Sequence, residues 1–143
     1  MHPTTQKASN DSDQEAVQKS VLEQIKEDYS RFPEHQTYSL YAEDVQFKDP
    51  MNDFSGVQKY QQMIGFLARF FRDIDLELHS IEQTTPALIK TAWTLHMTAP
   101  APWAPRLSIP GRSELGLNEQ GLINSHIDYW NCSRLAVLKQ VFS

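Results

Sequence analysis

The sequence predicts a single α+β domain in which N-terminal helices pack on one face of a curved, mixed and mainly antiparallel sheet. Apolar residues recur at helical spacing over residues 17–32 and again over residues 57–71. Apolar and polar residues alternate over residues 73–79, as they do in a half-buried strand. Strand-forming segments then follow one another from residue 87 to residue 131, with turns between them. A bent sheet with helices on one face would leave a cone with an open mouth.

The bulk properties predict one soluble domain. A chain of 143 residues is long enough to bury a core of its own. Its only cysteine, Cys132, cannot form an internal disulfide, and no cysteine pair is available as metal ligands. The chain starts without an apolar signal and has no run of roughly 18 apolar residues, so we expect a cytoplasmic protein. The net charge of −5 argues against nucleic acid and against a membrane as partners.

The N-terminal part predicts a tail, two helices and a strand. Residues 1–11 are polar and without periodicity, which predicts a disordered tail before a domain at residues 12–143. Ser12 and Glu15 can form a capping box for the first helix, which Pro33 ends. A short helix is expected over residues 38–42, and a strand over residues 45–47.

The central helix is expected to begin at Ser55, where Ser55 and Gln58 can form a second capping box. Asp49 and Pro50 end the strand before it, because proline cannot donate to a sheet ladder. A strand that passes into a core helix through an acidic turn often forms the rim of a pocket. The apolar stripe of this helix consists of Val57, Tyr60, Met63, Ile64, Leu67, Phe70 and Phe71.

The C-terminal half predicts four antiparallel strands and a last helix. The proline-rich residues 99–105 must form a loop, and Pro110-Gly111 suggests a bulge or a bend. A tight hairpin turn is expected where Gly121 can adopt a positive φ. Ser133 can cap the final helix. The expected strands are residues 73–79, 87–98, 107–118 and 122–131.

His126 and Asp128 form the first candidate site. They are two residues apart on a predicted strand, so they share one face with Asn124 and Trp130. A histidine beside a carboxylate can pass a proton near neutral pH. The alternative is that this face is exposed to water, while Ile123, Ile127 and Tyr129 on the other face form the core.

Asp49 and Arg112 are further candidates. Asp49 lies at a strand end beside aromatic residues, where burial would raise its pKa; alternatively it caps backbone N–H groups in a turn. Arg112 shares a strand face with Glu114, and the two could form a surface ion pair. If Arg112 points inward, it would bind an anionic group or hold Asp128.

Several segments resemble the nuclear-transport-factor-2-like superfamily, also called the cystatin-like fold. The resemblance rests on FKDPMNDFSG at residues 47–56, WTLH at 93–96, GRSELGLNEQGLI at 111–123 and HIDYW at 126–130. It covers about residues 17–142 and is closest to an uncharacterised family of cyanobacteria and plant plastids. It implies a cone-shaped α+β barrel.

The superfamily includes ketosteroid isomerase, scytalone dehydratase, limonene epoxide hydrolase and polyketide cyclases, and also members that only bind ligands or only dimerise. Polyketide cyclases of this fold carry His and Asp at the positions that match His126 and Asp128. They tend to have Asp where this chain has Asn131, which puts the full cyclase chemistry in doubt.

Two hypotheses follow. The first is a pocket that binds or converts a small apolar molecule by acid–base chemistry without a cofactor or metal. Its catalytic groups would be His126, Asp128 and Asp49. The second hypothesis is an interaction module that dimerises through its sheet and catalyses nothing; a homodimer is expected in either case. The ligand-binding wall of the first hypothesis would consist of Tyr38, Tyr41, Phe47, Tyr60, Trp93, Arg112 and Trp130.

Overall fold

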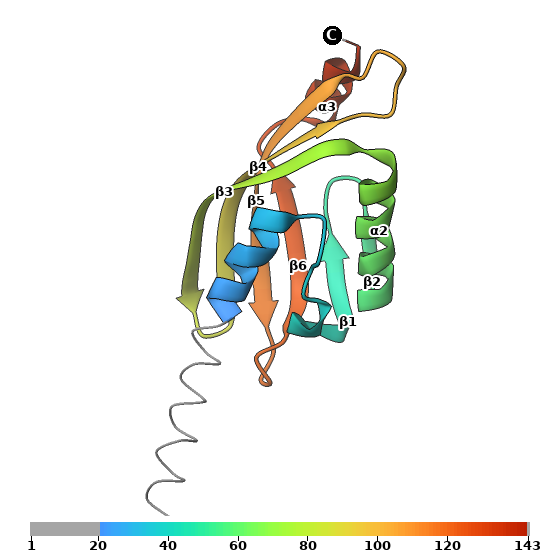
Figure 1. Cartoon of the computed structure of the whole chain (residues 1–143). Coiled ribbons are helices and arrows are strands. Elements are labelled where there is room, and N and C mark those ends of the chain that lie inside the picture. Colours follow the sequence, from blue (N-terminus) through green and yellow to red (C-terminus); the bar gives the residue numbers. More distant parts are fainter. Residues whose placement is uncertain (1–20, 143) are drawn as a thin grey trace, which may run out of the picture.

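The computed structural model describes residues 21–142 as three helices, one 3-10 turn and a six-stranded sheet (Figure 1). The predicted tail and the predicted capping box of Ser12 and Glu15 lie outside the described residues. A helix over residues 21–31 comes first. It is followed by η1 (Tyr38–Leu40), β1 (Tyr41–Lys48), β2 (Asp53–Ser55), α2 (Val57–Phe70), β3 (Arg72–Thr85), β4 (Leu88–Thr98), β5 (Arg106–Leu117), β6 (Ile123–Trp130) and α3 (Arg134–Val141).

The sheet is mixed, as the sequence predicted. Its strand order is β2-β1-β6-β5-β4-β3, and β1 lies parallel to β6 while the other neighbours are antiparallel. The 21–31 helix and α2 cover the same face of the sheet, and α3 lies at one end of the molecule (Figure 1). The predicted fold class, an α+β cone with helices on a curved sheet, is therefore confirmed.

The helices lie on the sheet because their apolar stripes face it. Tyr60 and Ile64 of α2 are buried and pack with Phe47 of β1. Ile25 of the 21–31 helix is buried against Ile89 and other residues of the strands. The carboxylate of buried Asp28 accepts hydrogen bonds from the backbone N–H and the hydroxyl of Thr37, at 2.9 Å each. This contact ties the helix to the segment that leads into η1.

The start of α2 differs from the prediction. The helix begins after Gly56, whose φ of 111° favours glycine, and no side chain caps it. Ser55 lies instead in the short edge strand β2, and its hydroxyl accepts a hydrogen bond from Gln46 of β1. The capping box of Ser55 and Gln58 was therefore wrong, because Ser55 is used for strand pairing. Residues 41 and 42 likewise belong to β1 rather than to a short helix.

The predicted bulge at Pro110-Gly111 is also absent, because the pairing of β5 with β4 runs through both residues without a shift. Proline has no backbone N–H, so Pro110 cannot donate to a neighbouring strand. Its carbonyl accepts the N–H of Asn131, which lies just after β6 ends, so the missing N–H would face the region beyond that strand and its absence is tolerated. Gly111 is needed for space: a Cβ there would lie 2.5 Å from the Trp93 ring.

A register shift does occur one strand further on, in β6. Gly116 pairs with Ser125 but Leu117 pairs with Ile123, which leaves Asn124 as the extra residue. Ile123 is therefore buried in the core, and Asn124 is exposed. The expectation that Asn124 shares a face with His126 was wrong for this reason, since the bulge reverses the alternation at that point.

Candidate functional site

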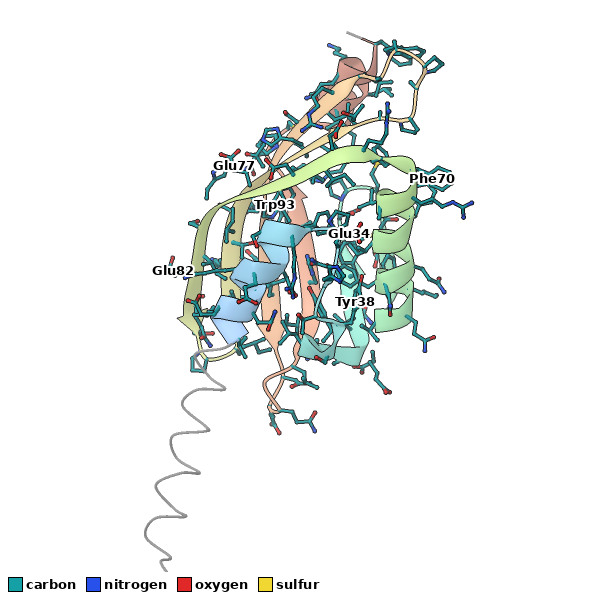
Figure 2. The ribbon with its side chains drawn as sticks, viewed as in Figure 1. Glu34, Tyr38, Phe70, Glu77, Glu82 and Trp93 are labelled. Carbon is teal, nitrogen blue, oxygen red and sulfur yellow. The ribbon has the colours of Figure 1, made fainter. Side chains whose placement is uncertain are left out.

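A cavity of about 460 Å³ lies between the 21–31 helix, α2 and the concave face of the sheet. Most of its wall is apolar, with residues such as Met97, Leu107 and Ile109 from the strands. Trp93 lines the cavity from β4, near one end of the 21–31 helix (Figure 2). An apolar cavity with a few polar side chains is the usual form of a small-molecule site.

His126 and Asp128 line this cavity from β6. His126 is 6% exposed, and its Nε2 lies 2.7 Å from Oδ1 of Asp128. Ring contacts with Phe47, Tyr41 and Tyr60 surround the imidazole. The two side chains therefore face inward as a hydrogen-bonded pair, which is the placement that the pocket hypothesis requires.

The other nitrogen of the imidazole is also bonded. Nδ1 of His126 lies 3.2 Å from the hydroxyl of Tyr41, and that hydroxyl donates to the hydroxyl of Tyr60 at 3.4 Å. If both imidazole nitrogens carry a proton, both donate, one to Asp128 and one to Tyr41. If the ring is neutral with its proton on Nε2, Nδ1 accepts the single proton of the Tyr41 hydroxyl, and Tyr60 can then donate to Tyr41 instead. Tyr60, Tyr41, His126 and Asp128 thus form one continuous hydrogen-bonded chain.

Burial raises the pKa of the Tyr41 and Tyr60 hydroxyls. The negative charge of Asp128 raises both pKa values further, by a smaller amount. Both hydroxyls therefore stay neutral and keep a proton to donate. While the hydroxyl of Tyr41 donates to Tyr60, the proton of Tyr60 has no acceptor among the described residues, so it is available to an oxygen atom of a ligand.

Asp128 is held from β5 as well. The hydroxyl of Ser113, its cross-strand partner, donates to the same Oδ1 that contacts His126. The indole N–H of Trp93 in turn donates to Ser113 at 2.8 Å. Within the described chain, Oδ2 of Asp128 has no hydrogen-bond partner, and the side chain is 19% exposed. Oδ2 is therefore the oxygen that can accept a proton from a ligand.

Tyr29 adds a second polar point to the same wall. Its hydroxyl lies 2.9 Å from Oγ1 of buried Thr91. Burial, with the charge of Asp128, raises the pKa of Tyr29 to about 12, so this hydroxyl is also neutral. From the sequence, Tyr29 was expected only as part of the apolar stripe of the first helix. Its helical spacing did not predict a polar contact.

Both interpretations of Asp49 that the sequence left open, a carboxylate with a raised pKa and a turn cap, agree with the structure. Asp49 lines the cavity, and burial raises its pKa. At the same time it caps a turn, because its Oδ1 accepts the N–H of Met51 at 2.7 Å and the amide of Asn52 at 3.1 Å. These bonds lower the pKa in part and fix the carboxylate at the rim of the cavity.

Two predicted wall residues lie elsewhere. Tyr38 packs edge-on against Tyr60 with 6.1 Å between ring centroids, but it does not line the cavity. Arg112 lies on the outer face of β5, one residue from inward-facing Ser113, and its guanidinium stacks on Tyr129 at 4.4 Å. Strand alternation thus places Arg112 away from the cavity, and Ser113 rather than Arg112 holds Asp128. The other predicted site residues, Tyr41, Phe47, Tyr60, Trp93 and Trp130, all line the cavity.

Sequence reasoning gave Ser113 and Asp28 no role in this site. Ser113 is buried on the inward face of β5 between Gly111 and Leu115, so a polar residue at an inward position was the available signal. Asp28 lines the cavity, but its carboxylate already accepts bonds from Gln24, Arg31 and Thr37. It positions the helix and has little capacity left for a ligand.

Among residues 21–142, no group of three or more His, Cys, Asp or Glu side chains is arranged to hold a metal ion. In the same part of the chain, no helix is long and apolar enough to cross a lipid bilayer.

The arrangement of these elements is the fold of nuclear-transport-factor-2-like proteins. The structure resembles an NTF2-like protein of Burkholderia pseudomallei K96243, with a TM-score of 0.69 and 12% identity over 85% of this chain and 97% of that chain. It also resembles a SnoaL-like protein of Shewanella denitrificans OS-217 that is assigned as a polyketide cyclase, with a TM-score of 0.66 and 16% identity over 87% and 96%.

A third solved structure has the ketosteroid isomerase-like fold and contains trimethylamine. It comes from Catenulispora acidiphila DSM 44928 and gives a TM-score of 0.64 and 15% identity over 79% of this chain and 85% of that chain. At these identities the likeness shows the fold. Residues 19–126 match the family described as an uncharacterized conserved protein, DUF2358, and the chain belongs to that family. Comparison with curated proteins gives no match.

Proposed function

We propose that the protein binds a small apolar molecule in the cavity behind α2 and converts it by acid–base chemistry without a cofactor. The observation that supports this most directly is the inward-facing His126–Asp128 pair in an otherwise apolar cavity of about 460 Å³. A surface pair would not need the cover of three aromatic rings that His126 has. The names of the solved relatives, among them a protein assigned as a polyketide cyclase, are consistent with this class of ligand.

The free atoms of the site suggest how the reaction would proceed. Oδ2 of Asp128 would take a proton from a carbon atom next to a carbonyl group of the ligand. The hydroxyl of Tyr60 would donate to the carbonyl oxygen as negative charge develops there. If Asp128 then returned the proton to another atom of the ligand, the reaction would be an isomerisation. Asp128 could also return the proton after ring closure or after loss of water from the ligand. His126 would hold Asp128 in place and relay protons to Tyr41.

Asp128→Asn tests this role. The substitution keeps the shape and an oxygen for the bond from Ser113, but it removes the base and its charge. We first identify a bound molecule by mass spectrometry of an organic extract of the purified protein, and then measure its binding and conversion. Conversion should fall at least about a hundredfold, the lower range for a lost general base.

Asp44→Asn is the matched control, because Asp44 is exposed on β1 and does not line the cavity. It should leave binding and conversion unchanged. Equal activity of the two variants would exclude Asp128 as the base. An extract without any small molecule, together with no binding of apolar ketones, would favour the alternative that the protein is a non-catalytic interaction module.

A further inference from the structure

The large exposed apolar side chains of the described residues gather at one end of the molecule. This end is formed by the turn after β1, the C-terminal part of α2, the loop over residues 99–105 and α3 (Figure 1). Each of these side chains is between 44% and 73% exposed, and Phe70 projects outward from the end of α2 (Figure 2). The set, which we call the apolar end, consists of Met51, Phe66, Phe70, Trp103, Leu135, Leu138 and Phe142.

Direct contacts hold these segments together. The guanidinium of Arg134 in α3 donates to the carbonyl of Pro50, next to Met51. The indole of Trp103 donates to the carbonyl of Val141, and its ring lies 6.3 Å from that of Phe142. These contacts join three of the four segments, and the C-terminal part of α2 lies at the same end of the molecule (Figure 1).

The charge of this end is opposite to that of the whole chain. The chain has a net charge of −5, yet residues 99–107 and 130–142 contain no acidic residue. Arg106 and Arg134 lie in these segments, and Arg69 and Arg72 flank Phe70 at the end of α2. Asp49, Asp53 and Asp73 are acidic residues close in sequence to these segments, and the carboxylate of Asp49 is bonded within its turn. The cavity opens here as well, because Met51 and Phe66 line it and are exposed.

We propose that the apolar end docks on the surface of an anionic lipid bilayer. Exposed Trp, Phe and Leu side chains beside basic residues are typical of proteins that bind in the bilayer interface. The apolar side chains are buried among the lipids, and the basic residues are attracted to anionic head groups. A second copy of the chain would bring like charges together, whereas anionic lipid complements them. This proposal departs from the expectation drawn from net charge, because net charge averages over a molecule whose charges are separated.

Docking in this orientation would put the cavity mouth against the lipid. An apolar ligand could then pass between bilayer and cavity without crossing water, since its transfer into water would cost about 25 cal/mol per Å² of apolar surface. The transfer of a ligand between bilayer and cavity rests on the proposed function. The docking itself rests only on the exposed side chains and charges of the apolar end. The two can fail independently.

Co-sedimentation with vesicles tests the docking. Vesicles of equal parts phosphatidylcholine and phosphatidylglycerol should bind the full chain at low salt, and pure phosphatidylcholine vesicles should bind it much more weakly. The double variant Leu138→Gln/Phe142→Gln should bind at least about tenfold more weakly, because both side chains would lose their burial in lipid. Arg134→Gln should bind about fivefold more weakly.

Lys90→Gln is the charge-matched control, because Lys90 is exposed on β4 and has no part in the apolar end. It should bind anionic vesicles as the parent does. The emission of the parent should also shift to shorter wavelength as Trp103 enters the interface. The proposal is overturned if the parent does not bind anionic vesicles, or if the double variant binds as well as the parent while both remain folded by circular dichroism. It is equally overturned if the double variant only turns a dimer into a monomer.

Discussion

Asp128 receives both of its hydrogen bonds on one oxygen, and this detail decides what the site can do. Ser113 and His126 both bond to Oδ1, and no hydrogen bond to Oδ2 is found among the described residues. Period-two alternation predicted from the sequence that His126 and Asp128 lie together. The partners Ser113 and Tyr41 could not be predicted, because they depend on strand register and on the path of β1 beside β6.

Tyr41→Phe tests the hydrogen-bond chain at this scale. It removes the hydroxyl that contacts Nδ1 of His126 and leaves a buried nitrogen unpaired. The free energy of unfolding should fall by about 1–3 kcal/mol, measured by urea titration. Tyr38→Phe is the control, because no hydrogen bond of its hydroxyl is found within the described part, and it should change stability by less than about 0.5 kcal/mol. Equal losses in both variants would contradict the chain.

Asp49→Asn tests the half-buried carboxylate at the rim. Burial raises the pKa of Asp49, so the folded protein binds this proton more tightly than the unfolded chain does. The stabilisation from that proton is present below the ordinary pKa and is lost as the pH rises through the raised pKa. The variant should therefore be more stable than the parent at pH 7, with a difference that shrinks as the pH falls toward 4.

Thermal unfolding across this pH range measures the difference between the two melting temperatures. Asp44→Asn serves as the exposed control and should follow the parent at each pH. A difference for Asp49→Asn that stays constant with pH would show that charge burial at Asp49 does not affect stability.

At the scale of elements, the spacing of apolar residues predicted the long strands better than it predicted the connections and irregularities between them. The alternation over residues 73–79 identified β3, and Ser133 caps α3 as expected, with its hydroxyl accepting the N–H of Ala136. The edge strand β2 and the bulge at Asn124 were missed, because each depends on a neighbouring strand that a local pattern does not contain. The bulge matters for function, since it lets Ile123 and His126 both face inward.

Gly111→Ala tests the close approach of β5 to the cavity wall. The new Cβ would lie 2.5 Å from Trp93 and 2.7 Å from the carbonyl oxygen of Tyr129, so the indole must move away from Ser113. Stability should fall by about 1–3 kcal/mol, as in other overpacked cores. Gly65→Ala on exposed α2 meets nothing within 4 Å and should instead gain about 0.5–1 kcal/mol. A neutral result for Gly111→Ala would refute the packing argument.

At the scale of the whole molecule, apolar side chains of the strands face the helices, and the outer face carries residues such as Lys90, His96 and Arg112. The prediction of a homodimer packed through its sheet was motivated by an excess of apolar strand residues, and it remains a prediction. Multi-angle light scattering at micromolar concentration should give the mass of two chains. A mass of about one chain over the whole range would contradict it.

The central claim is that the cavity binds a small apolar molecule, and a titration with the apolar dye N-phenyl-1-naphthylamine tests it most directly. The parent should show a saturable rise in dye fluorescence. Met63 lines the cavity from α2 and its neighbour Gln62 faces outward, so Met63→Trp should weaken dye binding at least about tenfold while Gln62→Trp leaves it unchanged. A parent without saturable binding, or equal binding by the two variants, would contradict the account.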